Sequence, residues 1–319
     1  MKSLVTLLTS GLVLISSSAF SASSSGLQNN YNENAVIRAI SSDIQPTEPA
    51  ARSESVPRGD ITLDPGLVAS AALVIDQQSG AILFEKNPDA AQPIASITKL
   101  MTAIVVLDAA LSLDEILVVT HVDAALARPT HSKLKVGARL TRAELLRLML
   151  MASENRAAAT LARSYPGGVE HFVRRMNEAA LSLGLFSTRF ADPTGLNIGN
   201  VSTARELTQL VRRAYHYDAI RTYSTTTEYS APIGRARRAV FHNTNRLTRN
   251  EDWTIGLSKT GFITASGQCL VLQAAVAGRP LVMVILDSWG KGGRIDDALK
   301  LRRWLEQRSD RVVVAGLSF

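Results

Sequence analysis

Three apolar runs dominate the last third of the chain and predict neighbouring strands. They are "WTIGLSKTG" (253–261), "CLVLQAAVAG" (269–278) and "PLVMVILDSW" (280–289). Each is short and bounded by turn-forming residues, as strands are. Only the step from Gly278 to Pro280 separates the last two, so we expect them to pair as a hairpin. Near the other end, "AALVIDQQSGAILFEKN" (71–87) has two apolar runs around the turn signal "DQQSG" and predicts another hairpin.

Between these ends, apolar residues recur every three or four positions, a period typical of helices. The stretch "TRAE" at 141–144 indicates a capping box at a helix start, and Ser202 is a candidate N-cap. Leu145 to Met151 should be core, and "ILVVT" (116–120) resembles a strand. The predicted helices cover 96–110, a segment from 141, 156–164, 169–183, 203–216 and 295–307.

This order of elements predicts an α+β fold. Strands at both ends of the chain and helices in the middle favour one antiparallel sheet built from the N- and C-terminal segments, flanked by helices and interrupted by a helical insertion.

The first residues, "MKSLVTLLTSGLVLISSSAFSA", have one lysine, an apolar run and then small residues, a pattern that predicts a cleaved signal peptide over 1–21. An uncleaved membrane anchor is the alternative, although the run is shorter than the roughly 18 residues that span a bilayer. Residues 22–62 are polar and read as a disordered linker. We expect one folded domain over 63–310, a short tail over 311–319, and no spanning segment after signal cleavage.

The formal net charge is +7. Loss of Lys2 leaves +6, and three basic and five acidic residues between 22 and 60 contribute −2, so the body from 61 onward carries +8. Such a surface favours polyanionic partners. Export and the absence of any nucleic-acid motif argue against nucleic acid. We interpret "GRARRAV" (234–240) as a solvated loop or an anionic-polymer contact.

Single residue types narrow the chemistry further. Cys269 is the only cysteine, so we expect no internal disulfide and no thiolate metal cluster, and its apolar surroundings predict a buried strand residue. The histidines have no metal-ligand spacing, and we expect neither a metal nor a cofactor. A Ser-His-Asp triad is not excluded by spacing, yet no G-x-S-x-G elbow supports one.

Ser96 and Lys99 stand three residues apart in the apolar run "PIASITKLMTAI" (93–104). On a helix they share one face, so the lysine amine lies within a turn of the serine hydroxyl. A serine needs a neighbouring base to become a good nucleophile, and apolar surroundings favour the neutral amine of lysine. Helix-start N–H groups also favour a developing oxyanion.

Two further signals strengthen this pair. "SEN" (153–155) falls in a break between helices, where a hydroxyl and an amide can face a cleft. "KTG" (259–261) ends a strand, and its glycine allows close approach of a substrate to the backbone. S-x-x-K, S-x-N and K-T-G, in this order, are the motif set of penicillin-binding proteins and serine β-lactamases.

The sequence resembles the low-molecular-mass penicillin-binding proteins of the S11 D-alanyl-D-alanine peptidase family, and within it the endopeptidase type. The resemblance extends from about residue 68 to 307. It rests on "QPIASITKLMTA", "SENRAAATLA", "YPGG", "TRFADPTGLNIGNVSTAREL", "FHNTNRL" and "LSKTGF". It implies the serine β-lactamase/DD-peptidase-like fold.

The resemblance implies roles for the catalytic residues. Ser96 would be the acylated nucleophile and Lys99 its general base. Ser153 and Asn155 would serve proton relay and binding of a substrate amide. The backbone N–H groups of Ser96 and Phe262 would form the oxyanion hole.

It implies roles in substrate binding as well. Lys259 and Thr260 would bind the carboxylate beside the scissile bond, with Gly261 giving the substrate access to the backbone. Arg294 matches an arginine that helps to hold this carboxylate in relatives. Asp192-Pro193-Thr194-Gly195 is interpreted as a turn without a catalytic part.

The resemblance implies hydrolysis of D-alanyl–diaminopimelate cross-links in peptidoglycan through a serine acyl-enzyme, in the periplasm, and covalent binding of β-lactam antibiotics. A DD-carboxypeptidase that removes the terminal D-Ala is the nearest alternative. A class A β-lactamase is disfavoured because no suitable glutamate motif is found. A non-catalytic peptidoglycan-binding protein is the alternative from another class.

Overall fold

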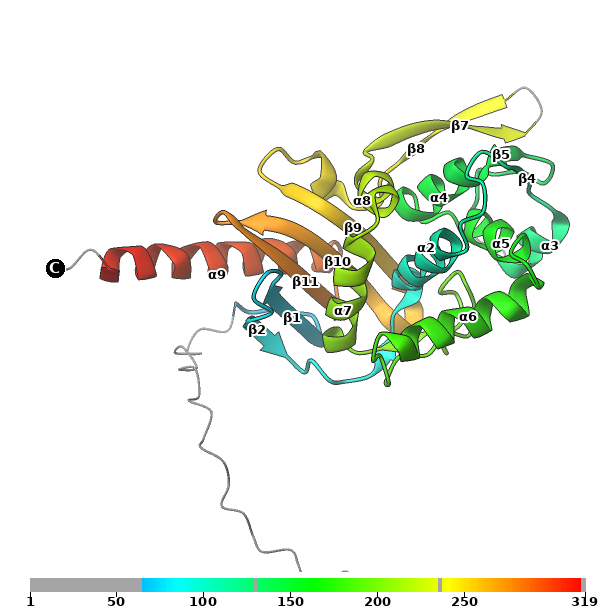
Figure 1. Cartoon of the computed structure of the whole chain (residues 1–319). Helices are drawn as coiled ribbons and strands as arrows, with labels where there is room; N and C mark the ends of the chain where they lie inside the picture. Colours follow the sequence, from blue (N-terminus) through cyan, green and yellow to red (C-terminus); the bar gives the residue numbers. More distant parts are fainter. Residues whose placement is uncertain (1–64, 129–130, 235–236, 317–319) are drawn as a thin grey trace, which may run out of the picture. The chain divides into compact units, whose positions relative to one another are not determined.

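Five strands form one antiparallel sheet in the part of the chain that the structure describes (Figure 1). A computed structural model describes residues 65–128, 131–234 and 237–316, with side chains as far as residue 308. The strand order is β2-β1-β11-β10-β9, which confirms the predicted joining of the two chain ends. The strands are β1 (Ala71–Asp76), β2 (Ile82–Lys86), β9 (Thr254–Ile263), β10 (Gly267–Val276) and β11 (Arg279–Ser288).

Helices cover both faces of this sheet. Successive side chains of a strand point to opposite faces, so a fully apolar strand supplies two cores. One face packs with α7 (Ala204–Tyr215) and the other with α9 (Gly293–Gly316) (Figure 1). Leu73, Val271, Val282 and Val284 lie in the α7 core, and Val74, Leu270, Leu272 and Met283 lie in the α9 core.

The insertion between β2 and β9 is mainly helical, as predicted. Its helices are α2 (Lys99–Asp108), α3 (His121–Leu126), α4 (Arg142–Met151), α5 (Asn155–Arg163), α6 (Gly168–Ser182), α7 and α8 (Asp218–Thr225). The predicted capping box at the start of α4 is confirmed: the Glu144 amide donates to Thr141 Oγ1 at 3.1 Å, and the Thr141 amide donates to Glu144 Oε2 at 2.9 Å.

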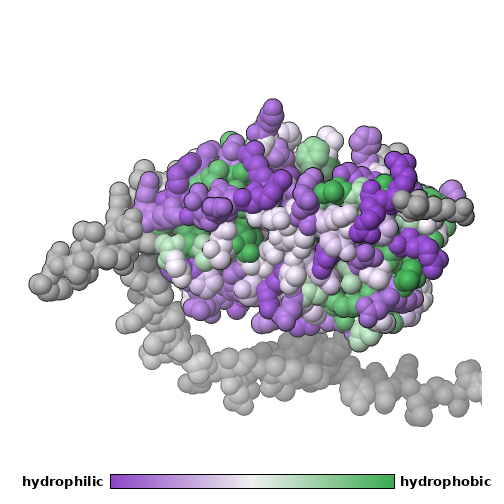
Figure 2. All heavy atoms as spheres, turned by 90° about the horizontal axis from the view of Figure 1, so that it is seen from above, coloured by the Kyte–Doolittle hydropathy of each residue, from purple (hydrophilic) through white to green (hydrophobic). Residues whose placement is uncertain are grey.

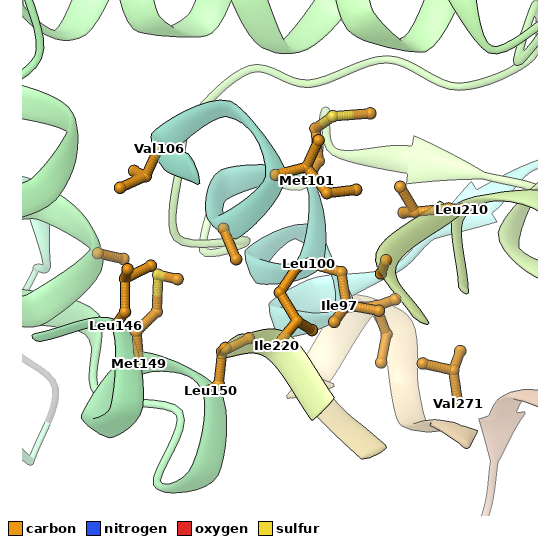
Figure 3. Close-up of a cluster of buried hydrophobic side chains, with 14 of the residues drawn as sticks. Ile97, Leu100, Met101, Val106, Leu146, Met149, Leu150, Leu210, Ile220 and Val271 are labelled. Carbon is orange, nitrogen blue, oxygen red and sulfur yellow. The ribbon is translucent and has the colours of Figure 1, made fainter. Parts of the chain in front are cut away.

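The centre of the insertion is the buried helix α2. Figure 3 shows Leu100, Met101 and Val106 of this helix among apolar side chains from several elements. They include Leu146, Met149 and Leu150 of α4, Leu210 of α7 and Val271 of β10. The stripe from Leu145 to Met151 is therefore core on most positions, as predicted. This packing holds the first turn of α2 in one place.

Short strand pairs complete the insertion. They are β3 (Gln92–Pro93) with β6 (Val201–Ser202), β4 (Ile116–Val118) with β5 (Arg139–Thr141), and β7 (Glu228–Gly234) with β8 (Arg237–His242). The interpretation of 234–240 as a loop was wrong for Gly234, which ends β7, and for 237–240, which belong to β8, whereas 235–236 lie outside the described residues; the alternative of an anionic-polymer contact stays a prediction. Tyr229 and Phe241 pair on the inner face of this hairpin and pack on the core, whereas the charged residues point away.

Helices α3 and α8 were not predicted, and the helix predicted over 96–110 is α-helical only over Lys99–Asp108. Two further helix ends differ from prediction. The N-cap of α7 is Thr203, not Ser202, because the Thr203 hydroxyl accepts the Glu206 amide at 3.1 Å. Helix α9 begins at Gly293 and continues to Gly316 instead of ending near Gln307, because no proline or glycine interrupts 294–315. The predicted signal peptide and linker lie outside the described residues. None of the helices in the described ranges combines the length and apolarity needed to cross a membrane.

Candidate active site

Ser96 lies on a 3₁₀ turn, η1 (Ala95–Thr98), that leads directly into α2. Ala95 has a left-handed φ of 45°, an uncommon conformation for a residue with a Cβ. The Thr98 hydroxyl donates to the Ala95 carbonyl oxygen at 2.7 Å. Of the four side chains on this turn, only that of Ser96 is not buried. The turn therefore presents one hydroxyl from an otherwise buried segment.

Lys99 is fully buried at the first position of α2. Its Nζ lies 2.8 Å from Ser96 Oγ, 2.7 Å from Asn155 Oδ1 and 2.5 Å from the Thr194 carbonyl oxygen. Burial lowers the pKa of Lys99 from 10.5 to about 7, although the negative charges of Asp192 and Glu154 act in the opposite direction. The amine form is therefore well populated near neutral pH.

The three partners of Lys99 suit both of its protonation states. An ammonium group has three N–H donors and can donate to all three oxygens. The neutral amine has two N–H donors and a lone pair, so it can donate to Asn155 and Thr194 while it accepts the Ser96 hydroxyl proton. The geometry thus allows proton transfer from Ser96 to Lys99 without movement of either backbone.

The acceptor on Thr194 belongs to the 192–195 turn, which the sequence interpretation left outside the site. Asp192 Oδ1 accepts the amides of Thr194 and Gly195, both at 2.6 Å, and Asp192 Oδ2 accepts the Asn197 amide at 2.6 Å. A Cβ on Gly195 would lie 2.0 Å from the Ala95 carbonyl oxygen, so this turn lies directly against η1. The prediction of a turn is confirmed, but this turn contacts Lys99. Its many Asp, Thr and Asn residues were the feature of the sequence that could have indicated a hydrogen-bonded part of the site.

The S-E-N segment forms the break between α4 and α5. Ser153 has a left-handed φ of 57°, and Glu154 caps α5 by accepting the Arg156 amide at 3.2 Å. Glu154 is buried, and burial raises its pKa. This conformation directs Asn155 to Lys99, and it places Ser153 Oγ 2.9 Å from Lys259 Nζ. No sequence pattern pointed to a role for Glu154.

K-T-G lies near the end of β9, beside η1. Lys259 is buried, and burial, followed by the positive charges of Lys99 and Arg294, lowers its pKa well below the usual value. A Cβ on Gly261 would meet the Ile94 carbonyl oxygen at 2.8 Å and the Ser96 amide nitrogen at 3.3 Å. Glycine is therefore required for β9 to approach the nucleophile this closely.

Two residues from elsewhere in the chain contact this strand. The hydroxyls of Thr260 and the exposed Thr244 are 2.6 Å apart, a contact that the sequence analysis did not predict. Arg294, at the start of α9, donates to the Gly261 carbonyl oxygen at 2.8 Å. Phe262 follows Gly261 with its side chain 63% exposed. The structure thus brings all nine predicted site residues to one region around Ser96.

The described residues contain no group of three histidine, cysteine, aspartate or glutamate side chains arranged to hold a metal ion. Cys269 is buried in β10, as predicted, and burial raises its pKa to about 11.

Comparison with known proteins places this geometry in context. The family model described as D-alanyl-D-alanine carboxypeptidase, peptidase S11, matches residues 60–290. A D-alanyl-D-alanine endopeptidase of Pseudomonas aeruginosa is 44% identical over 258 residues, which cover 81% of this chain and 83% of that protein. One from Escherichia coli K12 is 42% identical over 243 residues, covering 76% and 78%. The crystal structure of the Streptomyces K15 DD-transpeptidase matches with a TM-score of 0.70 at 29% identity, covering 76% of this chain and 98% of that one.

Proposed function

Because the chain belongs to the S11 family of D-alanyl-D-alanine peptidases, we propose that it cleaves peptidoglycan cross-links as a serine D-alanyl-D-alanine endopeptidase. The scissile bond would join D-alanine to diaminopimelate. The observation that carries the catalytic assignment is the contact of Lys99 Nζ with Ser96 Oγ at 2.8 Å, within a buried site. The observation that favours cross-links is the 42–44% identity to proteins named endopeptidases.

Acylation begins with Lys99. Its neutral amine takes the Ser96 proton, and Ser96 Oγ attacks the carbonyl carbon of D-alanine. The backbone N–H groups of Ser96 and Phe262 stabilise the resulting oxyanion. The proton that Lys99 has taken passes through Ser153 to the leaving amine as the C–N bond breaks, so Lys99 is neutral again and Ser153 keeps its hydroxyl. Lys99 then takes a proton from water as the water oxygen attacks the acyl-enzyme ester, and gives this proton to Ser96 Oγ as the ester C–O bond breaks and the D-alanyl carboxyl group is released.

Lys259 recognises the carboxylate beside the scissile bond. Its amine is buried, so the protonated form is disfavoured in the free protein. A substrate carboxylate beside Lys259 raises its pKa again and favours the ammonium form. Thr260 donates a hydroxyl hydrogen bond to the same carboxylate, Asn155 binds a substrate amide, and Arg294 holds the K-T-G strand through the Gly261 carbonyl.

A β-lactam presents a carboxylate and a reactive carbonyl in a similar arrangement. We therefore expect penicillins to acylate Ser96 and to remain bound, since the ring-opened product cannot leave as an amine does. The remaining alternative is a DD-carboxypeptidase, favoured by the description of the matching family model. Both activities use the same residues.

Purified protein incubated with defined muropeptides distinguishes these activities. Release of monomers from tetrapeptide dimers, detected by mass spectrometry, supports the endopeptidase. Loss of only a terminal D-Ala from a pentapeptide monomer supports the carboxypeptidase, and binding without any cleavage supports a peptidoglycan-binding protein.

Ser96→Ala should abolish both cleavage and labelling by a fluorescent penicillin, because Ser96 Oγ is the hydroxyl hydrogen-bonded to Lys99 Nζ among the residues that the structure describes. Ser187→Ala, at an exposed serine outside the site, is the matched control and should label normally. Retained labelling of Ser96→Ala would exclude Ser96 as the nucleophile.

The predicted signal peptide over 1–21 supports a periplasmic location. Cell fractionation, with N-terminal sequencing of the mature protein, tests this part of the proposal.

A further inference from the structure

Four exposed basic residues lie on two neighbouring segments of the insertion. Lys133 and Lys135 belong to the loop after α3, and Arg237 and Arg238 begin β8. None of the four forms a salt bridge with a residue that the structure describes. We call these four residues the basic strip.

Direct contacts hold the two segments of the basic strip together. Lys133 Nζ donates to the Val240 carbonyl oxygen at 2.7 Å and lies 5.3 Å from the centre of the Phe241 ring. The Lys135 amide donates to the Ile233 carbonyl oxygen at 3.0 Å. The loop therefore follows the β7–β8 hairpin, and the four positive charges belong to one surface.

The loop is also fastened to the S-E-N segment of the site. The Ser132 hydroxyl donates to Glu154 Oε1 at 2.6 Å, and Arg156 Nη1 donates to the Leu134 carbonyl oxygen at 2.5 Å. Glu154 separates Ser153 from Asn155 in sequence and is buried. Lys133 and Lys135 are therefore sequence neighbours of Ser132 and Leu134, the two loop residues that bond to Glu154 and Arg156.

The hairpin leads to the other side of the site. Strand β8 ends at His242, and the chain then reaches Thr244, whose hydroxyl lies 2.6 Å from that of Thr260. The Thr244 amide donates to the Met151 carbonyl oxygen at 2.9 Å, at the end of α4. The loop of the basic strip thus contacts the S-E-N segment, and the hairpin is connected along β8 to Thr244 beside the K-T-G strand.

Unpaired like charges on one surface repel each other and attract anions. Figure 2 views the molecule from above, the side on which Figure 1 has the β7–β8 hairpin, and hydrophilic residues cover much of this face.

We propose that the basic strip binds carboxylates of cross-linked stem peptides, outside the residues that flank the scissile bond. This inference rests on the proposed function and deepens it. Lys259 accounts for one carboxylate only, whereas a cross-link joins two stem peptides that carry others. The strip would therefore favour extended, polyanionic wall peptides over small ligands with a single carboxylate.

The test uses the full chain with Lys135→Glu and Arg237→Glu together. Neither the Lys135 ammonium nor the Arg237 guanidinium forms a hydrogen bond or ion pair with a residue that the structure describes, so the exchange reverses the charge without breaking such a bond. Arg174→Glu with Arg212→Glu, on α6 and α7, is the matched control with the same change in net charge. The wild type is measured in parallel at low and high salt.

We expect the strip variant to raise KM for cross-linked dimers about 10-fold at low ionic strength, with kcat unchanged, and the difference to shrink in high salt. The control variant should match the wild type. In a Ser96→Ala background, co-sedimentation with insoluble peptidoglycan should weaken by a similar factor, and amidation of the wall carboxylates should remove the difference.

An unchanged KM and unchanged co-sedimentation overturn the proposal, as does an equal loss in the control variant. Strip-dependent binding to vesicles of anionic phospholipid, without any on peptidoglycan, also overturns it in favour of a membrane surface. If the wild type fails to cleave dimers, the proposed function fails, and the co-sedimentation result still decides whether the strip binds peptidoglycan.

Discussion

At the scale of single residues, the central feature is a buried lysine with a lowered pKa. Lys99 has lost most of its hydration, and three oxygen atoms replace the water molecules it would otherwise bind. Two acidic residues, Asp192 and Glu154, limit how far its pKa falls. This balance places the amine and ammonium forms close to equal population near neutral pH.

The rate of acylation by a penicillin should therefore rise with pH through about 7 and level off above it, because the neutral amine of Lys99 is the base. Stopped-flow measurement of the second-order acylation constant from pH 5 to pH 9 tests this. A flat profile across this range would contradict the assignment of Lys99.

Asp192→Asn should change this profile in two ways. The charge of Asp192 raises the pKa of Lys99, so its loss should move the ascending limb to lower pH. The maximal rate should fall about 10-fold, because the Thr194 carbonyl loses part of its support. Asp114→Asn, at an exposed carboxylate outside the site, is the control, and a loss of rate without a shift of the limb would indicate a purely structural role.

At the scale of elements, three segments meet where glycine permits close approach. The 192–195 turn and β9 both lie against the segment that carries Ser96. A Cβ on Gly195 would overlap the backbone of Ala95, and a Cβ on Gly261 would overlap the Ile94 carbonyl oxygen directly before η1. The position of the nucleophile thus depends on two contacts between backbones as well as on its own helix.

Gly195→Ala should abolish acylation, because the added Cβ would lie 2.0 Å from the Ala95 carbonyl oxygen. Gly137→Ala is the matched control: Gly137 has a φ of 85°, close to the 84° of Gly195, but nothing lies within 4 Å of its added Cβ. Both variants should lose about 1 kcal/mol of stability from backbone strain, yet only Gly195→Ala should lose penicillin labelling. Equal labelling of the two variants would refute the packing argument.

At the scale of the whole molecule, the site lowers the stability of the fold. The sheet and its two helix-covered faces bury enough apolar surface to hold two lysines, Lys99 and Lys259, away from water. A lysine whose pKa falls on folding binds its proton more tightly in the unfolded chain. The free energy of unfolding therefore contains an unfavourable contribution that depends on pH.

This contribution has a definite sign. Between about pH 7 and pH 10.5, unfolded Lys99 is protonated and folded Lys99 is mainly neutral, so its contribution to stability rises with pH, by at most about 1.4 kcal/mol per unit. Below pH 7 both states bind the proton and the penalty is constant. Denaturant unfolding of wild type and Lys99→Met should be measured at several pH values. The free energy of unfolding of the wild type should rise relative to that of the variant as pH increases, and a constant difference between the two would contradict this linkage.

Much of the fold follows from local patterns. The hairpin over 71–87, the paired runs before and after Gly278, and the Thr141–Glu144 capping box depend on neighbouring residues, so short-range chemistry was sufficient to predict them. The β7–β8 hairpin and the extension of α9 were not predicted. Consecutive charged residues at the start of β8 interrupt the alternation of apolar and polar residues that indicates a strand. Nothing in the sequence near Gln307 marks a helix end.

For the site, the sequence determined which side chains are available: the spacing of Ser96 and Lys99, and the order of S-E-N and K-T-G. Only the tertiary structure decided what surrounds them. Thr194 lies 95 residues from Lys99, and Ser153 lies 106 from Lys259, so no local pattern can report these contacts. The burial that lowers the pKa of both lysines, and the joining of the basic strip to the site, arise only when the sheet and the insertion pack together.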